Sequence, residues 1–209
     1  RDQGEVRAED GRWQLKNLHL WVFLAVACSV AVPAAVPRVA FAGPNVDSKI
    51  LIHLVDRSQV SGDLCSLPSA HPTCNSIRTA ADLYPHLYYG YILVTGASSV
   101  AGISTVEFGL APDPVSADNR IFSWTLCADN EIPTHWWPEA SLPAGNLVTW
   151  ESVSNCQRLE PEGPGTGVVA CAGYIYCGAD VPGGKIRVTR HPVSGRASVT
   201  GCDGVTDVI

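Results

Sequence analysis

The feature of this sequence that most limits its fold is a series of short β-rich segments separated by turn-forming residues. Clusters of Gly, Pro, Asn, Asp and Ser stand between the segments, and such clusters end strands and form turns. No heptad, repeat or long amphipathic helical pattern interrupts the series. The sequence therefore predicts an all-β fold, an antiparallel β-sandwich of Ig-like or jelly-roll-like type with about eight strands. The expected strands lie at residues 48–55, 88–94, 102–110, 121–127, 146–153, 168–180, 185–190 and 197–199.

Some segments carry more detailed predictions. Residues 48–55 are apolar on both faces, a pattern typical of a strand near the middle of a sheet. Residues 181–184, Val-Pro-Gly-Gly, predict a hairpin turn into the strand that follows. Trp124 and Trp150 lie within expected strands, and because large aromatic side chains dominate core burial, we expect both in the core.

An export signal is predicted near the N-terminus. Residues 18–32 form an apolar run that follows Lys16 and precedes the small-residue sequence Ala40-Phe41-Ala42. A basic start, a short apolar run and an A-x-A site in this order are typical of a signal peptide, here with cleavage after Ala42. A retained membrane anchor is the alternative, but prolines interrupt the run before it reaches the ~20 residues that span a bilayer.

The sequence is therefore expected to divide into three parts. Residues 1–14 are acidic and without pattern, and the sequence contains no Met, so we expect this part to be untranslated upstream sequence or a disordered extension. Residues 15–42 are the predicted signal peptide, and residues 43–209 form one β-sandwich domain. The expected location is secreted or at the cell surface, after bacterial export.

The charge of the expected mature domain argues against nucleic acid as a partner. Residues 43–209 hold nine of the 14 basic residues and 16 of the 20 acidic residues, which gives a net charge of about −7. They contain two lysines and no basic cluster. Binding to nucleic acid or to an anionic membrane depends on clustered positive charge, so neither is expected once the signal peptide is removed.

Disulfides are expected in an oxidising compartment. Signal cleavage removes one of the eight cysteines, and the remaining seven leave at least one thiol free or paired between chains, with a monomer expected rather than a covalent dimer. The short separation of Cys65 and Cys74 favours a local bond between them. Cys127 and Cys156 each follow a strand-like segment and form the second expected pair. A third pair is expected among Cys171, Cys177 and Cys202.

A long expected loop, residues 128–144, carries the candidate ligand-binding residues His135, Trp136, Trp137 and Glu139. An exposed aromatic ring can stack on a sugar, and a nearby carboxylate can accept hydrogen bonds from its hydroxyls. The alternative is that one or both tryptophans fold back and cap the open end of the sandwich.

Three tyrosines, Tyr88, Tyr174 and Tyr176, are expected on strand faces, where they either line a groove or are the half-buried tyrosines that are common in sheets.

Two acidic groups are candidates for binding calcium, although no cofactor is required by the sequence. Calcium takes oxygen ligands, which loop carboxylates supply. Neither group has the twelve-residue spacing of an EF-hand, and solvated turn carboxylates are the alternative. The residues are Asp129 and Glu131 in one group, and Asp203 and Asp207 in the other.

Several short motifs resemble exported bacterial β-sandwich proteins of unassigned function. They are residues 124–127, residues 145–150, Cys156-Gln157, residues 173–176 and Cys202. The resemblance covers most of residues 43–209. It implies export and a sandwich fold, and it implies no catalytic chemistry.

The predicted function follows from these observations together. No catalytic signature is found, and the Gly-Ala-Ser-Ser-Val-Ala-Gly sequence at residues 96–102 does not match the Gly-x-Ser-x-Gly nucleophile motif. We expect a binding or structural module at or outside the cell surface, with an extracellular glycan or protein as its partner. The alternatives are a secreted hydrolase that uses two carboxylates and a subunit of a surface assembly.

Overall fold

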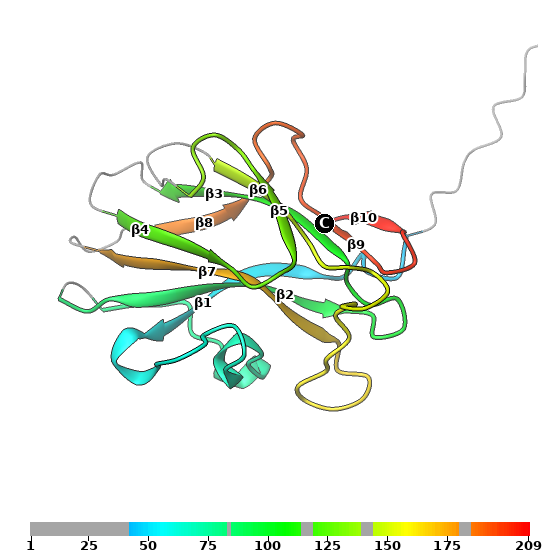
Figure 1. Ribbon diagram of the computed structural model, residues 1–209, viewed down its shortest axis with the longest axis horizontal. Coiled ribbons are helices and arrows are strands. Elements are labelled where there is room, and N and C mark those ends of the chain that lie inside the picture. Colours follow the sequence, from blue (N-terminus) through cyan, green and yellow to red (C-terminus); the bar gives the residue numbers. More distant parts are fainter. Residues whose placement is uncertain (1–41, 83–84, 114–118, 139–143, 180–184) are drawn as a thin grey trace, which may run out of the picture. The chain divides into compact units, whose positions relative to one another are not determined.

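A computed structural model describes residues 42–82, 85–113, 119–138, 144–179 and 185–209. Within these ranges, ten strands form two antiparallel sheets that pack face to face as two layers (Figure 1). The predicted all-β sandwich is thereby confirmed. No helix in the described ranges has the length and apolar character needed to cross a membrane. The strands are β1 (Lys49–Asp56), β2 (Tyr88–Ala97), β3 (Thr105–Asp113), β4 (Asn119–Leu126), β5 (Asn130–Pro133), β6 (Ala144–Thr149), β7 (Val168–Ala179), β8 (Lys185–Thr189), β9 (Ser198–Thr200) and β10 (Thr206–Val208).

The strand order differs from a simple series of hairpins. The four-stranded sheet has the order β1-β2-β7-β4, and the six-stranded sheet has the order β10-β9-β3-β6-β5, with β8 also paired to β3. The predicted hairpin between β7 and β8 is therefore wrong. β7 already has β2 and β4 on its two sides, so it offers no free edge to β8, which joins the other sheet. The turn itself, residues 181–184, lies outside the described residues.

The main core lies between the sheets and follows the two-residue alternation of strand side chains. Ile92 of β2 faces Phe108 of β3 and Val148 of β6 across the interior. Trp150, which follows β6, is buried, and Trp124 of β4 is partly buried against the same cluster. Both tryptophans therefore contribute to the core, as the sequence predicts.

A β-bulge in β7 lets this strand serve two apolar layers. The pairing of β7 with β2 shifts by one residue at Ala172. Because a bulge reverses the alternation, Cys171 before it and Tyr174 after it both face outward. Ala170 before it and Ile175 after it both face the core.

The chain between β1 and β2 covers part of the outer face of the four-stranded sheet. We call residues 57–82 the excursion; it is drawn in cyan to green on the side away from the six-stranded sheet (Figure 1). Its Leu64 and Ala70 are buried against Tyr91 and Leu93 of β2, and the Tyr91 hydroxyl donates a hydrogen bond to the Leu64 carbonyl at 3.2 Å. The excursion contains three short 3-10 turns, η1 (Arg57–Gln59), η2 (Pro68–Ala70) and η3 (Cys74–Ser76).

This cover corrects the prediction for β1. The strand lies at the edge of its sheet, not in the middle. Its inner face packs against the core through Ile50 and Ile52, and its outer face packs against the excursion through Leu51 and Val55. An apolar pattern on both faces of a strand therefore indicates that both faces are buried. It does not indicate how many strands pair with β1.

Within the described residues two disulfides are formed, and neither is a predicted pair. Cys65 bonds to Cys127 and so fastens the excursion to the end of β4. The predicted Cys65–Cys74 bond is wrong because Cys65 faces the end of β4, whereas Cys74 lies exposed at the start of η3. The predicted Cys127–Cys156 bond is wrong because Cys156 follows β6 of the other sheet and meets a different partner.

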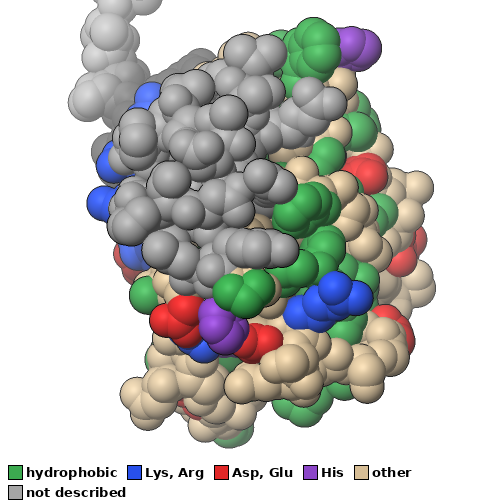
Figure 2. Space-filling view, turned by 90° about the vertical axis from the view of Figure 1, so that its left-hand side faces the viewer, with side chains coloured by type: hydrophobic (Ala, Val, Ile, Leu, Met, Phe, Trp, Pro, Cys, Tyr) green, Lys and Arg blue, Asp and Glu red, His purple; other side chains and the backbone are tan. Residues whose placement is uncertain are grey.

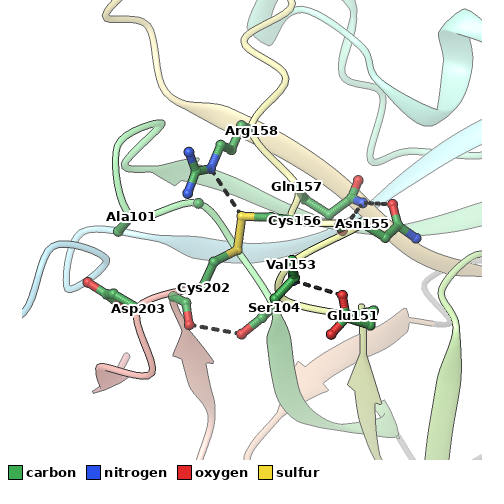
Figure 3. Close-up of a disulfide and its surroundings, with 12 residues drawn as sticks. Ala101, Ser104, Glu151, Val153, Asn155, Cys156, Gln157, Arg158, Cys202 and Asp203 are labelled. Atoms are coloured by element: carbon green, nitrogen blue, oxygen red, sulfur yellow. Dashed lines mark hydrogen bonds between the residues drawn. A yellow bond between two sulfur atoms is a disulfide. The ribbon is translucent and has the colours of Figure 1, made fainter.

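That partner is Cys202, in the turn between β9 and β10 (Figure 3). The Cys156–Cys202 bond packs directly on Gly102, where an added Cβ atom would lie 2.4 Å from the Cys156 sulfur. The φ of +67° at Gly102 also favours glycine. Arg158 Nε donates a hydrogen bond to the Cys156 sulfur at 3.1 Å.

Three cysteines of the described residues remain thiols, and the predicted pair among Cys171, Cys177 and Cys202 is wrong. Cys171 and Cys177 are buried on opposite faces of β7, so neither can reach the other. Burial raises the pKa of each of these two thiols to about 12. A thiol with such a pKa stays protonated at neutral pH and is a poor nucleophile. Cys74 is exposed.

We therefore predict that one thiol of residues 43–209 reacts with Ellman's reagent under native conditions and that three react in guanidinium chloride. The Cys74→Ser variant should abolish the native reaction and leave two thiols in denaturant, because the other two are accessible only after unfolding. Absorbance of the released thionitrobenzoate measures both counts. Three fast thiols in the native protein would contradict the placement of Cys171 and Cys177.

Candidate functional site

The structure separates the two tryptophans of the predicted ligand-binding loop. Trp137 folds back into the sandwich and contacts the rings of Phe108 and Trp124 edge to face, at centroid distances of 5.5 and 5.0 Å. Edge-to-face contacts of this kind add stability beyond the burial of the rings. Trp137 is therefore partly buried and packs against the core, as in the capping alternative.

Trp136 points away from the core. Its side chain is 48% exposed, and its ring meets that of His135 edge to face at 4.6 Å. His135 is itself exposed. The fourth predicted residue, Glu139, lies outside the described residues. In its described part, the loop thus presents one large exposed aromatic ring, which contacts His135.

Glu131 of β5 points into the sandwich and links the two sheets. Its Oε2 accepts hydrogen bonds from Trp124 Nε1 at 2.8 Å and from Asn146 Nδ2 at 2.6 Å. Trp124 belongs to the four-stranded sheet, and the fully buried Asn146 belongs to the six-stranded sheet. Glu131 therefore holds the two layers together at their β4–β5 edge.

The four calcium candidates do not converge. Asp129 accepts hydrogen bonds from Asn155 at the surface, whereas Glu131 points inside. Asp207 is buried and accepts hydrogen bonds from the backbone N–H groups of Gly43 and Asn45. Asp203 accepts one from the backbone N–H of Val205. Across the described ranges, no three His, Cys, Asp or Glu side chains gather where they could hold a metal ion.

A serine, a histidine and a glutamate meet in the six-stranded sheet, a combination that sequence inspection missed. Ser198 Oγ donates a hydrogen bond to Glu107 Oε2 at 3.3 Å, and His191 Nδ1 lies 3.9 Å from Glu107 Oε1. All three residues are buried. In this arrangement Ser198 donates to the carboxylate rather than to the histidine, so His191 is not placed to activate it as a nucleophile. The cluster fastens β3 to β9.

The described residues place a continuous group of aromatic rings on the outer face of the four-stranded sheet. The group lies beside the excursion and spans three neighbouring strands. We call it, together with the arginine that flanks it, the aromatic surface: Arg57 of η1, Tyr89 of β2, Phe122 of β4, and Tyr174 and Tyr176 of β7.

Each ring of the aromatic surface contacts another. Tyr89 lies 5.4 Å from Tyr174 and 5.5 Å from Tyr176 between ring centroids, and Phe122 lies 5.2 Å from Tyr176. The Arg57 guanidinium lies 5.3 Å from the centre of the Tyr176 ring, and its Nη1 donates a hydrogen bond to the Tyr176 hydroxyl at 2.8 Å. These contacts fix the rings in place before any ligand arrives.

Phe122 is the most exposed ring of the aromatic surface. The pairing of β4 with β7 is irregular between Ile121 and Ser123, so Phe122 is the extra residue of a bulge. Its neighbour Ile121 packs against the core, and Phe122 is 51% exposed. On the face seen in Figure 2, hydrophobic side chains gather in a strip beside a basic side chain.

Sequence analysis found only part of this surface. Tyr174 and Tyr176 lie on an outer strand face as expected, but Tyr88 is buried in the core and its neighbour Tyr89 takes the outer position. The alternation within residues 88–94 could have shown that Tyr89 and Tyr88 face opposite sides. The exposure of Phe122 depends on a bulge, for which the sequence carries no local signal.

No protein-family model matches the chain, and no curated protein sequence matches it. Among solved structures, the cohesin module of a family 33 glycoside hydrolase from Clostridium perfringens is similar with a TM-score of 0.42 and 8% sequence identity. The alignment covers 77% of this chain and 91% of the cohesin module. A similarity of this size does not by itself show a shared function.

We predict that Glu131→Ala lowers the free energy of unfolding by about 2–4 kcal/mol, because Trp124 and Asn146 then keep donors inside the sandwich without an acceptor. Urea unfolding followed by tryptophan fluorescence measures the change. Glu131→Gln is the matched control. Glutamine keeps an acceptor oxygen on a side chain of the same length, so this variant should lower the free energy of unfolding by less than the Ala variant does. Equal stability of the wild type and the Ala variant would show that Glu131 does not link the sheets.

Proposed function

We propose that residues 43–209 form an exported recognition module that binds a protein partner through the aromatic surface. The observation that carries the proposal is a half-exposed Phe122 set among three tyrosines and flanked by Arg57. Tyrosine, phenylalanine and arginine are enriched at protein interfaces, and tyrosine and arginine supply a large share of the residues that dominate binding energy.

The placement of these side chains supports recognition. They stand on strands rather than on a flexible loop, and ring contacts and the Arg57 hydrogen bond already restrict them. These side chains therefore lose little additional conformational entropy when a partner binds. Ser123 and Thr125, both exposed on β4, add hydroxyl groups at the rim.

Two observations support an extracellular setting. The disulfides Cys65–Cys127 and Cys156–Cys202 are of the kind that persist in oxidising compartments. The apolar run and Ala-x-Ala sequence before residue 43 have the order of an export signal.

Trp136 favours a second candidate function, recognition of a glycan. A large ring that is 48% exposed in a loop, with His135 beside it, suits stacking on one sugar residue. The Trp136 loop carries this candidate apart from the aromatic surface, so separate variants test the two functions.

Photo-cross-linking tests the protein-partner proposal. A photoreactive residue placed at Ser123, on the rim of the aromatic surface, should cross-link to an extracellular protein on intact cells of the source organism. The same residue placed at the exposed Thr206 of β10, in the other sheet, should not. The double substitution Phe122→Ser, Tyr176→Ser should remove the cross-linked product formed from position 123. The melting temperature should stay unchanged, because the two substituted rings are partly exposed. Equal cross-linking from both positions, or a product that survives the double substitution, would contradict the proposal.

A glycan array tests the second candidate. Trp136→Ala should abolish any glycan binding and leave the melting temperature unchanged, because the ring contributes little to the core. The Phe122→Ser, Tyr176→Ser variant is the matched control and should bind glycans as the wild type does. Unfolding of Trp136→Ala would show that the tryptophan is a structural cap.

A further inference from the structure

A cleft opens at the β1–β8 edge of the sandwich, remote in the strand order from β4 and β5. Its volume is about 340 Å³, which lies within the range of small-molecule pockets. Residues at the start of β1 form one wall, and the end of β8 forms the other. The residue before β9 and Ile209 complete the lining. The cleft therefore draws on both sheets, and none of its residues belongs to the aromatic surface.

The wall of the cleft has an apolar part. Ile50 of β1 and Val188 of β8 are partly buried and extend the core into the cleft. Ala197 and Ile209 are partly buried and line the same space. These four side chains offer a ligand an apolar bed a few carbon atoms long.

The cleft also has a basic rim. Lys49 approaches it from one sheet and Arg190 from the other, and both side chains are exposed. Within the described part of the chain, neither forms an ion pair. Residues 43–209 carry a net charge of about −7 and only two lysines. The two cationic side chains at this cleft therefore give it a local positive charge, opposite in sign to the net charge of the domain. Such a local reversal attracts an anion to this place.

A third observation lies inside the cleft. Ser48 lines it, and its side chain is completely buried. Among the described residues its Oγ has no hydrogen-bond partner, although its backbone N–H donates to the Asn45 carbonyl at 3.0 Å. A buried hydroxyl without a partner is costly, and native proteins rarely keep one without a reason. A ligand oxygen would supply the missing acceptor once the atoms that cover this hydroxyl move aside to admit it.

We propose that this cleft binds a small amphiphilic anion, an apolar body of a few carbon atoms that ends in a single carboxylate or phosphate. Lys49 and Arg190 attract the charged head, and Ser48 donates its hydroxyl hydrogen to one of the head's oxygens. Ile50 and Val188 contact the apolar body. The head and the body each match one part of the wall, so neither an inorganic anion nor a neutral hydrocarbon satisfies the whole cleft.

Calorimetric titration with three probes of equal chain length tests the proposal: octanoate, octyl phosphate and 1-octanol. At least one of the two anions should bind with one-to-one stoichiometry, and its affinity should fall as salt is added. The neutral alcohol should bind roughly tenfold more weakly, the effect of one lost charged hydrogen bond. The stronger anion identifies the head group. Equal binding of 1-octanol and the anions, or no binding by any probe, would overturn the proposal.

Variants separate the cleft from non-specific attraction. Arg190→Gln and Lys49→Gln should each weaken binding of the preferred anion by roughly tenfold. Arg196→Gln is the matched control, because Arg196 is an exposed arginine of the same β8–β9 connection that does not line the cleft. It should leave the affinity unchanged. Equal losses in all three variants would show that net charge, and not this cleft, attracts the anion.

Ser48→Ala distinguishes a ligand-binding role from a structural one. If the hydroxyl serves the ligand, its removal should weaken anion binding, while the melting temperature without ligand stays the same or rises, because an unpartnered buried group is lost. A fall in the melting temperature with unchanged affinity would assign Ser48 to the fold and remove it from the site.

Discussion

The four-stranded sheet is apolar on both faces, and the rest of the domain is arranged around this constraint. Its inner face packs on the six-stranded sheet, as in any sandwich. Its outer face would expose a large apolar area to water, so the excursion covers it, and the Cys65–Cys127 bond holds that cover on the sheet. The aromatic surface begins where the cover ends. The proposed recognition surface is thus the part of the outer face of the four-stranded sheet that the excursion leaves uncovered.

The two open edges of the sandwich are completed in different ways. At the β4–β5 edge, a carboxylate from β5 and tryptophans from β4 and from the loop after β5 fill the space between the layers. At the β1–β8 edge, the described side chains leave a cleft with a basic rim. A filled edge stabilises the fold, whereas an open edge leaves volume for a ligand. The same architecture therefore provides one structural edge and one candidate site.

Sequence patterns predicted the parts of this fold that depend on local alternation and missed those that depend on long-range contacts. Eight strands, the burial of Trp150 and the sandwich itself follow from period-two patterns and turn residues. β5 escaped notice because it has only four residues, Asn130–Pro133, one of them a proline, and is defined by its pairing with β6. Both disulfides join segments more than 40 residues apart, with separations of 62 and 46, and chain proximity gives no clue to such pairs. The cleft brings Lys49 and Arg190 together only through the packing of two sheets.

The order of the cysteines along the chain has a consequence for biosynthesis. The two bonds do not interleave: Cys127, the second partner of the first bond, precedes Cys156, the first partner of the second. In a chain that emerges N-terminus first, the first ring can close before any cysteine of the second appears. Within residues 43–127, Cys74 is the one thiol that competes for Cys65, and Cys171 and Cys177 emerge only after this segment. The docking of β7 between β2 and β4 buries those two thiols, so the assembled sheet withdraws them from oxidants and from further exchange.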